Sequence, residues 1–339
     1  MEQQIDIVIA AHDPARPVQR AVDSVLACPA ARVILVAHNT DPTAFGLKEH
    51  PRLIFMRLDG SPGIPGAPKN AGLARANLPW VGLLDSDDYF EEGALEAMLQ
   101  HAIAENADAV LAPLLIVGNR HRSRLPSLRS SGLTAVRDEL FYRTGPLGIF
   151  KQQLMNDAPD FNTCYKTGED LRVTAYLWSN ARNIVFHWND PAYVVTNDAH
   201  TRASTTKRSI AETGAPWLAV WDEPFIANWP KRLKVALATK LLRANYLQFD
   251  RSNLSADEET WAENFLKRLR EVAPLAFKHI AEYEWNGQPH KFSLRDLLFY
   301  RHSISRWEFI KKIQWMQDAA AELKGKLLRG RVNPRRKLN

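Results

Sequence analysis

Three carboxylates follow a short apolar run at residues 80–84. They are Asp85, Asp87 and Asp88, and Ser86 stands between the first two. The run is bounded by turn residues and is typical of a buried strand. Because open α/β sheets present ligands at the carboxyl ends of their strands, we expect these acids to face a crevice. Clustered carboxylates repel one another and are costly to desolvate unless a positive charge lies between them.

A hard divalent cation would supply that charge. Mg²⁺ and Mn²⁺ take one or two carboxylates together with substrate phosphates as ligands. The sequence therefore predicts an Mg²⁺ or Mn²⁺ site at the end of this strand. The alternative is a solvated acidic turn that caps a helix beginning near Phe90, since acids are common at helix N-termini.

A second acidic pair, Glu169 and Asp170, follows Gly168 and precedes a helical stripe at residues 171–178. Gly168 allows a sharp turn, so we expect both acids in the first turn of a helix. There they would interact with the helix dipole, which is worth under about 1 kcal/mol. Alternatively, one of them is a general base that deprotonates an acceptor hydroxyl while the other orients it. The two residues alone leave both interpretations open.

A loop rich in glycine and proline spans residues 60–68 and leads into a short helix expected from Lys69 to about Ala76. No Gly-Lys-Ser/Thr closes it and its glycine spacing is not that of a dinucleotide-binding loop, so neither phosphate motif is present. Its glycines permit close approach of the backbone to a ligand. Lys69, at a helix N-terminus, is a candidate contact for a diphosphate. An ordinary surface loop with a solvated lysine is the alternative.

The elements that must position these residues alternate between strands and helices. Strands are expected at residues 5–11, 32–37, 53–56, 80–84 and 109–117, and the first helix at 18–26. This alternation predicts an α/β fold with a mostly parallel sheet flanked by helices. After about residue 205 strand-like runs disappear, and helical patterns dominate residues 229–247, 257–283 and 293–328. We therefore expect a catalytic domain over residues 1–205, an all-helical accessory domain over 206–323 and a basic tail over 324–339.

Composition places the chain among soluble globular proteins, with 45% hydrophobic and 24% charged residues. The apolar stretch at 109–117 includes Pro113 and is far shorter than the roughly 20 residues needed to span a bilayer. The N-terminus enters a strand directly, so we expect no signal peptide. Two cysteines, Cys28 and Cys164, cannot make a disulfide framework, which favours a cytoplasmic protein.

The net charge of +6 is confined to one segment. Residues 324–339 carry seven basic side chains and no acid, which leaves 37 basic against 38 acidic residues elsewhere. A balanced fold argues against nucleic-acid binding, which needs a basic face on the domain itself. We expect the tail to contact anionic lipid at the inner face of the cell membrane, where each basic residue contributes about 1 kcal/mol.

Taken together, these features resemble the bacterial type of family 2 inverting nucleotide-sugar glycosyltransferases, which have the Rossmann-like GT-A fold. The resemblance covers about residues 5–205. Residues 21–26 are similar to the family's first helix, and 67–72 to its Ala-Arg-Asn-x-Gly signature. Residues 84–88 match the metal-binding Asp-x-Asp, and 168–170 match the Glu-Asp of the acceptor site. The order and spacing of all four motifs agree with the family.

The resemblance implies roles for individual residues. Asp87 and Asp85 would bind the metal ion, and His200 is a further candidate ligand, although a lone histidine is more often structural. Asp170 would be the base, with Glu169 beside it. Residues 200–204 resemble the segment that closes over the diphosphate. The donor-binding residues that the resemblance implies are Ala11, Asp13, Asn39, Lys69, Asn70, Asp85, Ser86, Arg202 and Ser204.

One position departs from the family pattern. The family usually has paired acids after the second strand, which read the nucleotide base, whereas this chain has His38 and Asn39. Asn39 can still offer a donor and an acceptor to a uracil edge. Among the ten tryptophans, Trp178 and Trp188 are the best candidates to stack on a sugar, and most of the others are expected in the core.

The predicted function is metal-dependent, non-processive transfer of a hexosyl group from a UDP-sugar to a hydroxyl of a glycan or cell-envelope acceptor. Inversion of configuration follows from the resemblance. Two alternatives remain open. One is a non-catalytic carbohydrate-binding or scaffold protein with the same fold. The other is a sugar-nucleotide pyrophosphorylase, although such enzymes have a Gly-rich loop directly after the first strand, and residues 10–14 contain no glycine.

Overall fold

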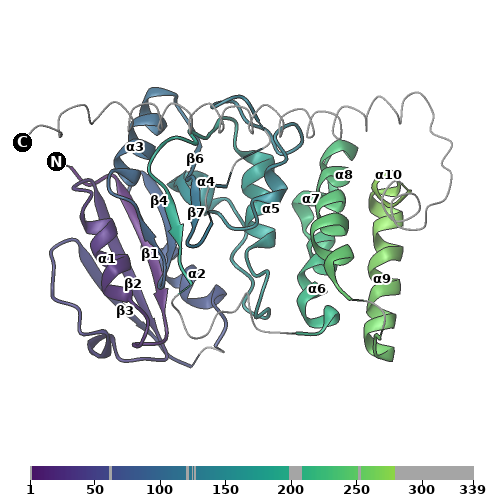
Figure 1. Cartoon of the computed structure of the whole chain (residues 1–339), viewed down its shortest axis with the longest axis horizontal. Coiled ribbons are helices and arrows are strands. Elements are labelled where there is room, and N and C mark those ends of the chain that lie inside the picture. The colour runs from purple at the N-terminus through teal and green to yellow at the C-terminus, as the bar shows by residue number, and fades with distance from the viewer. Residues whose placement is uncertain are drawn as a thin grey trace, which may run out of the picture. The chain divides into compact units, whose positions relative to one another are not determined.

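The computed structural model describes residues 2–60, 63–119, 122–123, 125, 127–197, 208–250 and 253–278 (Figure 1). One compact unit comprises Met1–Leu125 and Arg129–Pro289, so it contains both the expected catalytic region and the described helices after residue 208. A domain boundary near residue 205 therefore stays a prediction. The helical pattern at 293–328 and the basic tail at 324–339 lie outside the described residues.

A seven-stranded sheet forms the centre of this unit. Its first four strands are parallel, β8 is antiparallel to both of its neighbours, and β9 is parallel to β6. The mostly parallel sheet expected from the sequence is confirmed. The strand order is β3 (Leu53–Leu58), β2 (Ala31–His38), β1 (Ile5–Ala11), β4 (Trp80–Asp85), β8 (Gly148–Lys151), β6 (Ala109–Leu111) and β9 (Ile184–Val185).

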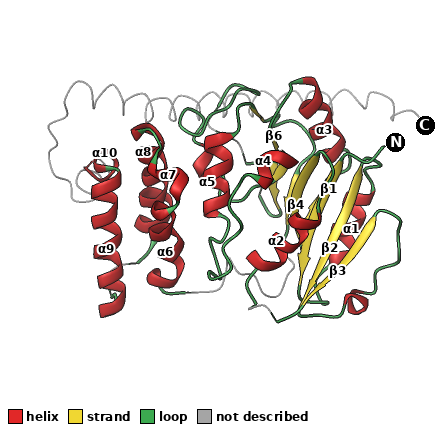
Figure 2. Ribbon diagram, turned by 180° about the vertical axis from the view of Figure 1, so that it is seen from behind, coloured by secondary structure: helices red, strands yellow, loops and turns green. Residues whose placement is uncertain are grey.

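Helices cover both faces of the sheet, which Figures 1 and 2 show from opposite sides. Ile5, Ile7 and Ile9 of β1 are fully buried in a core with α1 (Val18–Leu26) and α3 (Ala94–Ala104). On the other face, α2 (Gly66–Arg75) packs so closely that a Cβ on Gly72 would lie 2.3 Å from Cγ1 of Val8. Strands buried on both faces explain the continuous apolar runs of the sequence.

The single strand expected at 109–117 is wrong, because the chain changes sheets at Pro113. After β6, residues Leu114–Ile116 form β7 in a three-stranded sheet with β5 (Tyr89–Phe90) and β10 (Tyr193–Val195). Proline has no N–H to donate to a ladder, and the carbonyl of Pro113 accepts from the backbone N–H of Tyr193 at 2.8 Å instead. The helix considered near Phe90 is likewise a strand, and α3 begins four residues later.

The described part of the chain after residue 150 is mainly helical. In the last segments, aromatic rings form the core, with Trp261 5.2 Å from Phe265 and 5.9 Å from Trp217 between ring centroids. The helices are α4 (Gln152–Asn156), α5 (Leu171–Asn180), α6 (Ile210–Ala219), α7 (Pro224–Ala227), α8 (Lys231–Lys240), a π-helical turn at Leu241–Asn245, α9 (Ala256–Val272) and α10 (Pro274–Ala276). Short 3₁₀ turns lie at Pro42–Phe45, Leu140–Tyr142, Val220–Asp222 and Tyr246–Gln248.

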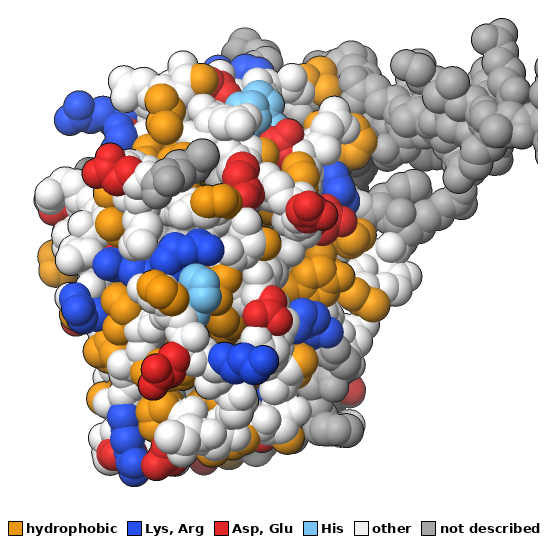
Figure 3. Space-filling view, turned by 90° about the vertical axis from the view of Figure 1, so that its left-hand side faces the viewer, with side chains coloured by type: hydrophobic (Ala, Val, Ile, Leu, Met, Phe, Trp, Pro, Cys, Tyr) orange, Lys and Arg blue, Asp and Glu red, His pale blue; other side chains and the backbone are white. Residues whose placement is uncertain are grey.

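The surface of the described residues carries charges of both signs. Figure 3 shows basic and acidic side chains interspersed over the visible face, without a field of one sign. Cys28 is buried, Cys164 is exposed, and both are free thiols. Among the helices that the structure describes, none has the length and apolar character needed to cross a bilayer.

Candidate active site

A cavity of about 740 Å³ opens at the carboxyl ends of the central strands. Ala10 and Ala11 of β1, His38 of β2 and Asp85 of β4 all line it. β1 pairs with β2 on one side and with β4 on the other: the chain runs from β1 through β2 to β3 on one side and then returns to β4 on the other, so the strand order reverses at β1. In open α/β sheets this switch point is where ligands bind.

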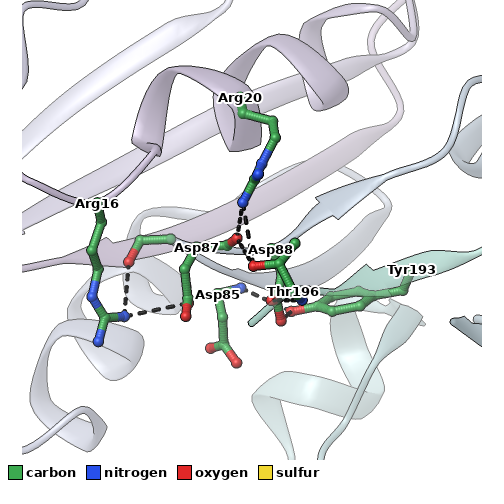
Figure 4. Close-up of polar contacts among 8 residues, drawn as sticks. Arg16, Arg20, Asp85, Asp87, Asp88, Tyr193 and Thr196 are labelled. Carbon is green, nitrogen blue, oxygen red and sulfur yellow. Dashed lines mark hydrogen bonds and ion pairs between the residues drawn. The ribbon is translucent and has the colours of Figure 1, made fainter. Parts of the chain in front are cut away.

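The acidic turn after β4 lines the cavity, and Figure 4 shows the polar contacts that hold it. Asp88 fastens this turn to β10, because its carboxylate accepts from the hydroxyl of Tyr193 at 3.0 Å and from the backbone N–H of Thr196 at 2.9 Å. Burial, reinforced by the charge of Asp85, raises the pKa of Asp88 to about 7. Asp88 therefore holds the shape of the turn.

Two arginines that precede or begin α1 hold Asp87. Arg16 lies in the connection from β1, and its guanidinium donates to the carboxylate of Asp87 and to the hydroxyl of Ser86, both at 3.3 Å. Arg20 and the hydroxyl of Thr196 donate to the backbone carbonyl of Asp87, the latter at 2.8 Å. Asp87 is only 4% exposed, and these contacts fix its position.

Asp85 is more exposed than Asp87 and Asp88. Its side chain is exposed to the cavity, and within the described segments no group forms a hydrogen bond or ion pair with its carboxylate. Figure 4 shows this carboxylate pointing away from the contacts that hold Asp87 and Asp88. Asp85 and Asp87 together offer only oxygen donors, which suits Mg²⁺ or Mn²⁺. The residues that could hold such an ion are therefore these two.

A different cluster, away from this cavity, combines His101, Glu105 and His187. The two imidazole rings stack with centroids 3.6 Å apart, and Glu105 contacts His101 at 3.2 Å and His187 at 2.6 Å. Two nitrogen donors with one carboxylate favour Zn²⁺ or another transition metal over Mg²⁺. None of the three residues lines the cavity, so the cluster is separate from the acidic turn.

Opposite the acidic turn, α2 is joined to the loop before α5 by two contacts. The ammonium of Lys69 donates to the carboxylate of Glu169 at 2.9 Å. The amide of Asn70 bonds the backbone of Phe161 twice, accepting from its N–H at 2.8 Å and donating to its carbonyl at 2.9 Å. Burial alone would lower the pKa of Lys69, but the carboxylates of Glu169, Asp85 and Asp170 outweigh it and raise the pKa. Lys69 is therefore positively charged at neutral pH.

Asp170 stands at the N-cap position of α5 and lines the cavity. Its side chain makes no capping hydrogen bond, so the pair Glu169 and Asp170 does not serve the helix in that way. Burial, followed by the charge of Glu169, raises the pKa of Asp170 to about 7, and the ammonium groups of Lys69 and Lys240 oppose this rise. A carboxyl group whose pKa lies near neutrality is suited to accept a proton during a reaction.

The structure brings together most of the residues that the sequence nominated. Three others, Asp13, Asn39 and Asn70, do not line the cavity. The carboxylate of Asp13 accepts from the backbone N–H of Ala15 at 2.9 Å within a turn, and Asn39 is exposed beside the lining residue His38. The side-chain amide of Asn70 is hydrogen-bonded to the backbone of Phe161. His200, Arg202 and Ser204 lie outside the described residues. The nominated residues that share the cavity are Ala11, Lys69, Asp85, Ser86, Asp87, Glu169 and Asp170.

Several lining residues were not nominated from the sequence: Arg16, His38, Trp217, Lys240 and Asn245. The last three come from α6, α8 and the π-helical turn, and nothing in their local sequence marks them as functional. The expectation for Trp178 is wrong, because it is buried in the core and its indole N–H donates to a backbone carbonyl at 3.1 Å. Trp188 does not line the cavity, whereas Trp217 does.

Comparisons with known proteins agree with this architecture. Residues 6–163 match the family described as Glycosyl transferase family 2. The poly(ribitol-phosphate) beta-N-acetylglucosaminyltransferase TarP of Staphylococcus aureus is 26% identical over 268 residues, which are 74% of this chain and 82% of TarP. The succinoglycan biosynthesis proteins ExoO and ExoU of Rhizobium meliloti are 31% and 34% identical over 50% and 57% of this chain. This chain spans only 54% of ExoO and 62% of ExoU.

A solved structure shows the same fold over a longer stretch. Residues 1–349 of TarS from S. aureus, in complex with UDP-GlcNAc, align with a TM-score of 0.69 over 86% of this chain and 94% of that one. The identity is 18%, so this likeness concerns the fold. The match over residues 6–163 confirms the expected family 2 glycosyltransferase domain, and the longer likeness to TarS shows the same fold around it.

Proposed function

We propose that this enzyme transfers a sugar from a UDP-sugar to a hydroxyl group of a cell-envelope glycan or polyol polymer, with inversion at the anomeric carbon. The observation that carries the proposal is the shared cavity, which places Asp85 and Asp87 after β4 opposite Asp170 before α5. TarS has been solved with UDP-GlcNAc, and the names of TarP, ExoO and ExoU concern polymers that carry sugars or polyols. These names support the substrate class.

On the donor side, Asp85 and Asp87 would hold Mg²⁺ or Mn²⁺, which supplies Lewis-acid stabilisation of the charge that develops on the departing diphosphate. Lys69 adds a positive charge that its ion pair with Glu169 maintains. Arg16 already binds one oxygen of Asp87, so it lies close enough to bind a phosphate oxygen when the donor enters. The cations of the chain thus surround the place where negative charge grows.

On the acceptor side, Asp170 accepts the proton of the attacking hydroxyl. Its raised pKa keeps it a competent base near neutral pH. Glu169 is held by Lys69 and lies beside the base, where its charge makes Asp170 more basic. Inversion follows when the hydroxyl attacks the anomeric carbon from the face opposite the diphosphate. A cytoplasmic location, with the tail at 324–339 against the inner face of the membrane, belongs to the same proposal.

A panel of nucleotide sugars tests this function on the full chain. Each is added with Mn²⁺ or with EDTA, and the melting temperature and the release of UDP are measured. A ligand at 100 times its dissociation constant adds about 2.7 kcal/mol to the free energy of unfolding, which a melting curve resolves. We expect Mn²⁺-dependent stabilisation and slow hydrolysis with at least one UDP-sugar. If no nucleotide sugar stabilises the protein or is hydrolysed, the proposed reaction is refuted.

A further inference from the structure

Lys240, the last residue of α8, is a buried lysine that lines the cavity. Its side chain is 3% exposed, yet among the described residues nothing forms a hydrogen bond or an ion pair with its ammonium group. Within the described part of the lining this sets it apart, because each of the other four lysines and arginines is paired with a carboxylate. The paired cations are Arg16 with Asp87, Lys69 with Glu169, and Lys166 and Arg208 with Glu212.

Asn245 presents a second unsatisfied group to the same cavity. The side-chain oxygen of Asn245 is buried, and no hydrogen-bond partner for it exists within the described structure. Residues five apart lie about 1.4 turns from each other in an α-helix, and therefore on different faces. The π-helical turn at Leu241–Asn245 has more residues per turn than an α-helix, and Lys240 and Asn245 both line the cavity. Such π-turns occur frequently at functional sites.

Lys240 lines the same cavity as Asp170, the proposed base. Lys240 and Asp170 interact electrostatically, but they form no direct ion pair, so a bound group can lie between them. On the donor side the cavity already has Lys69 and Arg16 beside the acidic turn. A group bound by Lys240 therefore belongs to the molecule whose hydroxyl Asp170 deprotonates.

We propose that Lys240 and Asn245 form an acceptor subsite for a phosphate ester of a polyol or sugar. Lys240 donates to a phosphate oxygen, and the amide of Asn245 binds a neighbouring hydroxyl. A desolvated ammonium is compensated far better by a full negative charge than by a neutral hydroxyl. Burial lowers the pKa of Lys240 to about 8 despite the opposing effect of Asp170, which shows that the ammonium is under-compensated without a ligand. This subsite rests on the proposed transferase function.

Calorimetry on the full chain, saturated with UDP and Mn²⁺, tests the subsite. The probes are two matched pairs, ribitol 5-phosphate with ribitol and glucose 6-phosphate with glucose, which separate a polyol from a sugar source. We expect the wild-type protein to bind at least one phosphate ester about tenfold or more tightly than its neutral partner. Lys240→Met should remove this preference, and Lys240→Arg should restore part of it. Lys231→Met changes an exposed lysine of the same helix and should keep the preference.

Two further measurements remain informative if Lys240→Met does not fold. Asn245→Asp adds a negative charge beside the ammonium and should weaken binding of the phosphate ester more than binding of the neutral polyol. Raising the salt concentration should weaken only the charged probe in the wild-type protein. Equal binding of charged and neutral probes by the wild type, or unchanged preference in Lys240→Met, overturns the subsite. Loss of UDP affinity in Lys240→Met would place the ammonium on the donor side and also overturns it. Failure of the transferase proposal is distinct, because UDP with Mn²⁺ would then not bind to the wild type.

Discussion

Replacing Asp170 with asparagine separates a catalytic role from a structural one. Asparagine keeps the size and most of the hydrogen bonding of the side chain but cannot take a proton from the acceptor. If Asp170 is the base, transfer at saturating donor should fall by roughly 10²–10⁴, the usual contribution of general acid–base catalysis. Affinity for UDP and Mn²⁺ should stay within a few-fold, because neither the acidic turn nor Lys69 is changed.

The dependence of the transfer rate on pH gives a second expected magnitude. A carboxyl with a pKa of about 7 is roughly one-tenth ionised at pH 6 and nine-tenths ionised at pH 8. Transfer by the wild-type enzyme should therefore rise about tenfold over this interval. The groups that face Asp170 are Glu169, Lys69 from α2 and Lys240 from α8. The residual rate of Asp170→Asn should be nearly independent of pH if Asp170 causes the rise.

Stability should change in the opposite direction from activity. The folded protein holds the proton of Asp170 up to about pH 7, whereas the unfolded chain releases it near pH 4. The unfolded state thus binds fewer protons between these values, and this carboxyl lowers the free energy of unfolding as the pH rises through them. Asp170→Asn should therefore be more stable than the wild type at pH 8, by about 1–3 kcal/mol. The difference should vanish below about pH 4.

Single-turnover transfer and urea unfolding on the same preparations check both effects. Asp160→Asn is a matched control, because Asp160 is exposed in the loop before α5 and does not line the cavity. Near-wild-type transfer by Asp170→Asn would remove Asp170 from the mechanism and leave Glu169 as the next candidate. Lower stability at pH 8 together with unchanged transfer would show that the side chain serves the helix.

Three further predictions concern the metal site, the packing of α2 and the tail. Asp87→Ala should abolish Mn²⁺-dependent stabilisation by UDP while melting remains cooperative, and undiminished stabilisation would move the metal site elsewhere. Gly66→Ala should lower the free energy of unfolding in urea by about 1–3 kcal/mol, because its Cβ would lie 2.1 Å from the carbonyl oxygen of Asn162. Gly63→Ala, which has open space around the added Cβ, is the control, and equal effects of the two would contradict this reasoning. Deleting residues 324–339 should weaken binding to anionic vesicles and spare donor hydrolysis, and equal binding by both proteins would refute the lipid contact.

The sequence predicts the first half of the fold well because its signals there are local. β1 to β4 are continuous apolar runs bounded by turn residues, and each expected strand lies within two residues of the observed one. The prediction fails at 109–117, where apolar residues continue through a change of sheet and only Pro113 marks the break. β8, β9 and β10 have two to four residues, which is too short for a periodic pattern to distinguish them.

The sequence likewise indicates some residues of the candidate site and not others. The acids at 85, 87, 169 and 170 stand next to glycine turns or strand ends, so their residue types and positions point to chemistry without knowledge of the fold. Arg16 and Lys240 carry no such signal, because a single basic residue on a helix or in a connection is usually solvated. Tertiary packing alone brings them together, because the connection before α1 and the end of α8 both reach the cavity.

Contacts between distant segments also determine how the two sides of the cavity depend on each other. Lys69 and Glu169 are a hundred positions apart, and Asn70 and Phe161 are separated by ninety-one, yet both pairs join α2 to the loop that carries Asp170. The proposed donor side consists of residues at strand ends of the sheet, whereas Lys240 and Asn245 come from a helical segment with its own aromatic core. The contacts described above for the acidic turn come from α1, from the connection before it, and from β10 with the residue that follows it. Under the proposed function, changes in this helical segment should therefore alter acceptor binding before donor binding, provided that the contacts of Lys69 and Asn70 keep Asp170 in place.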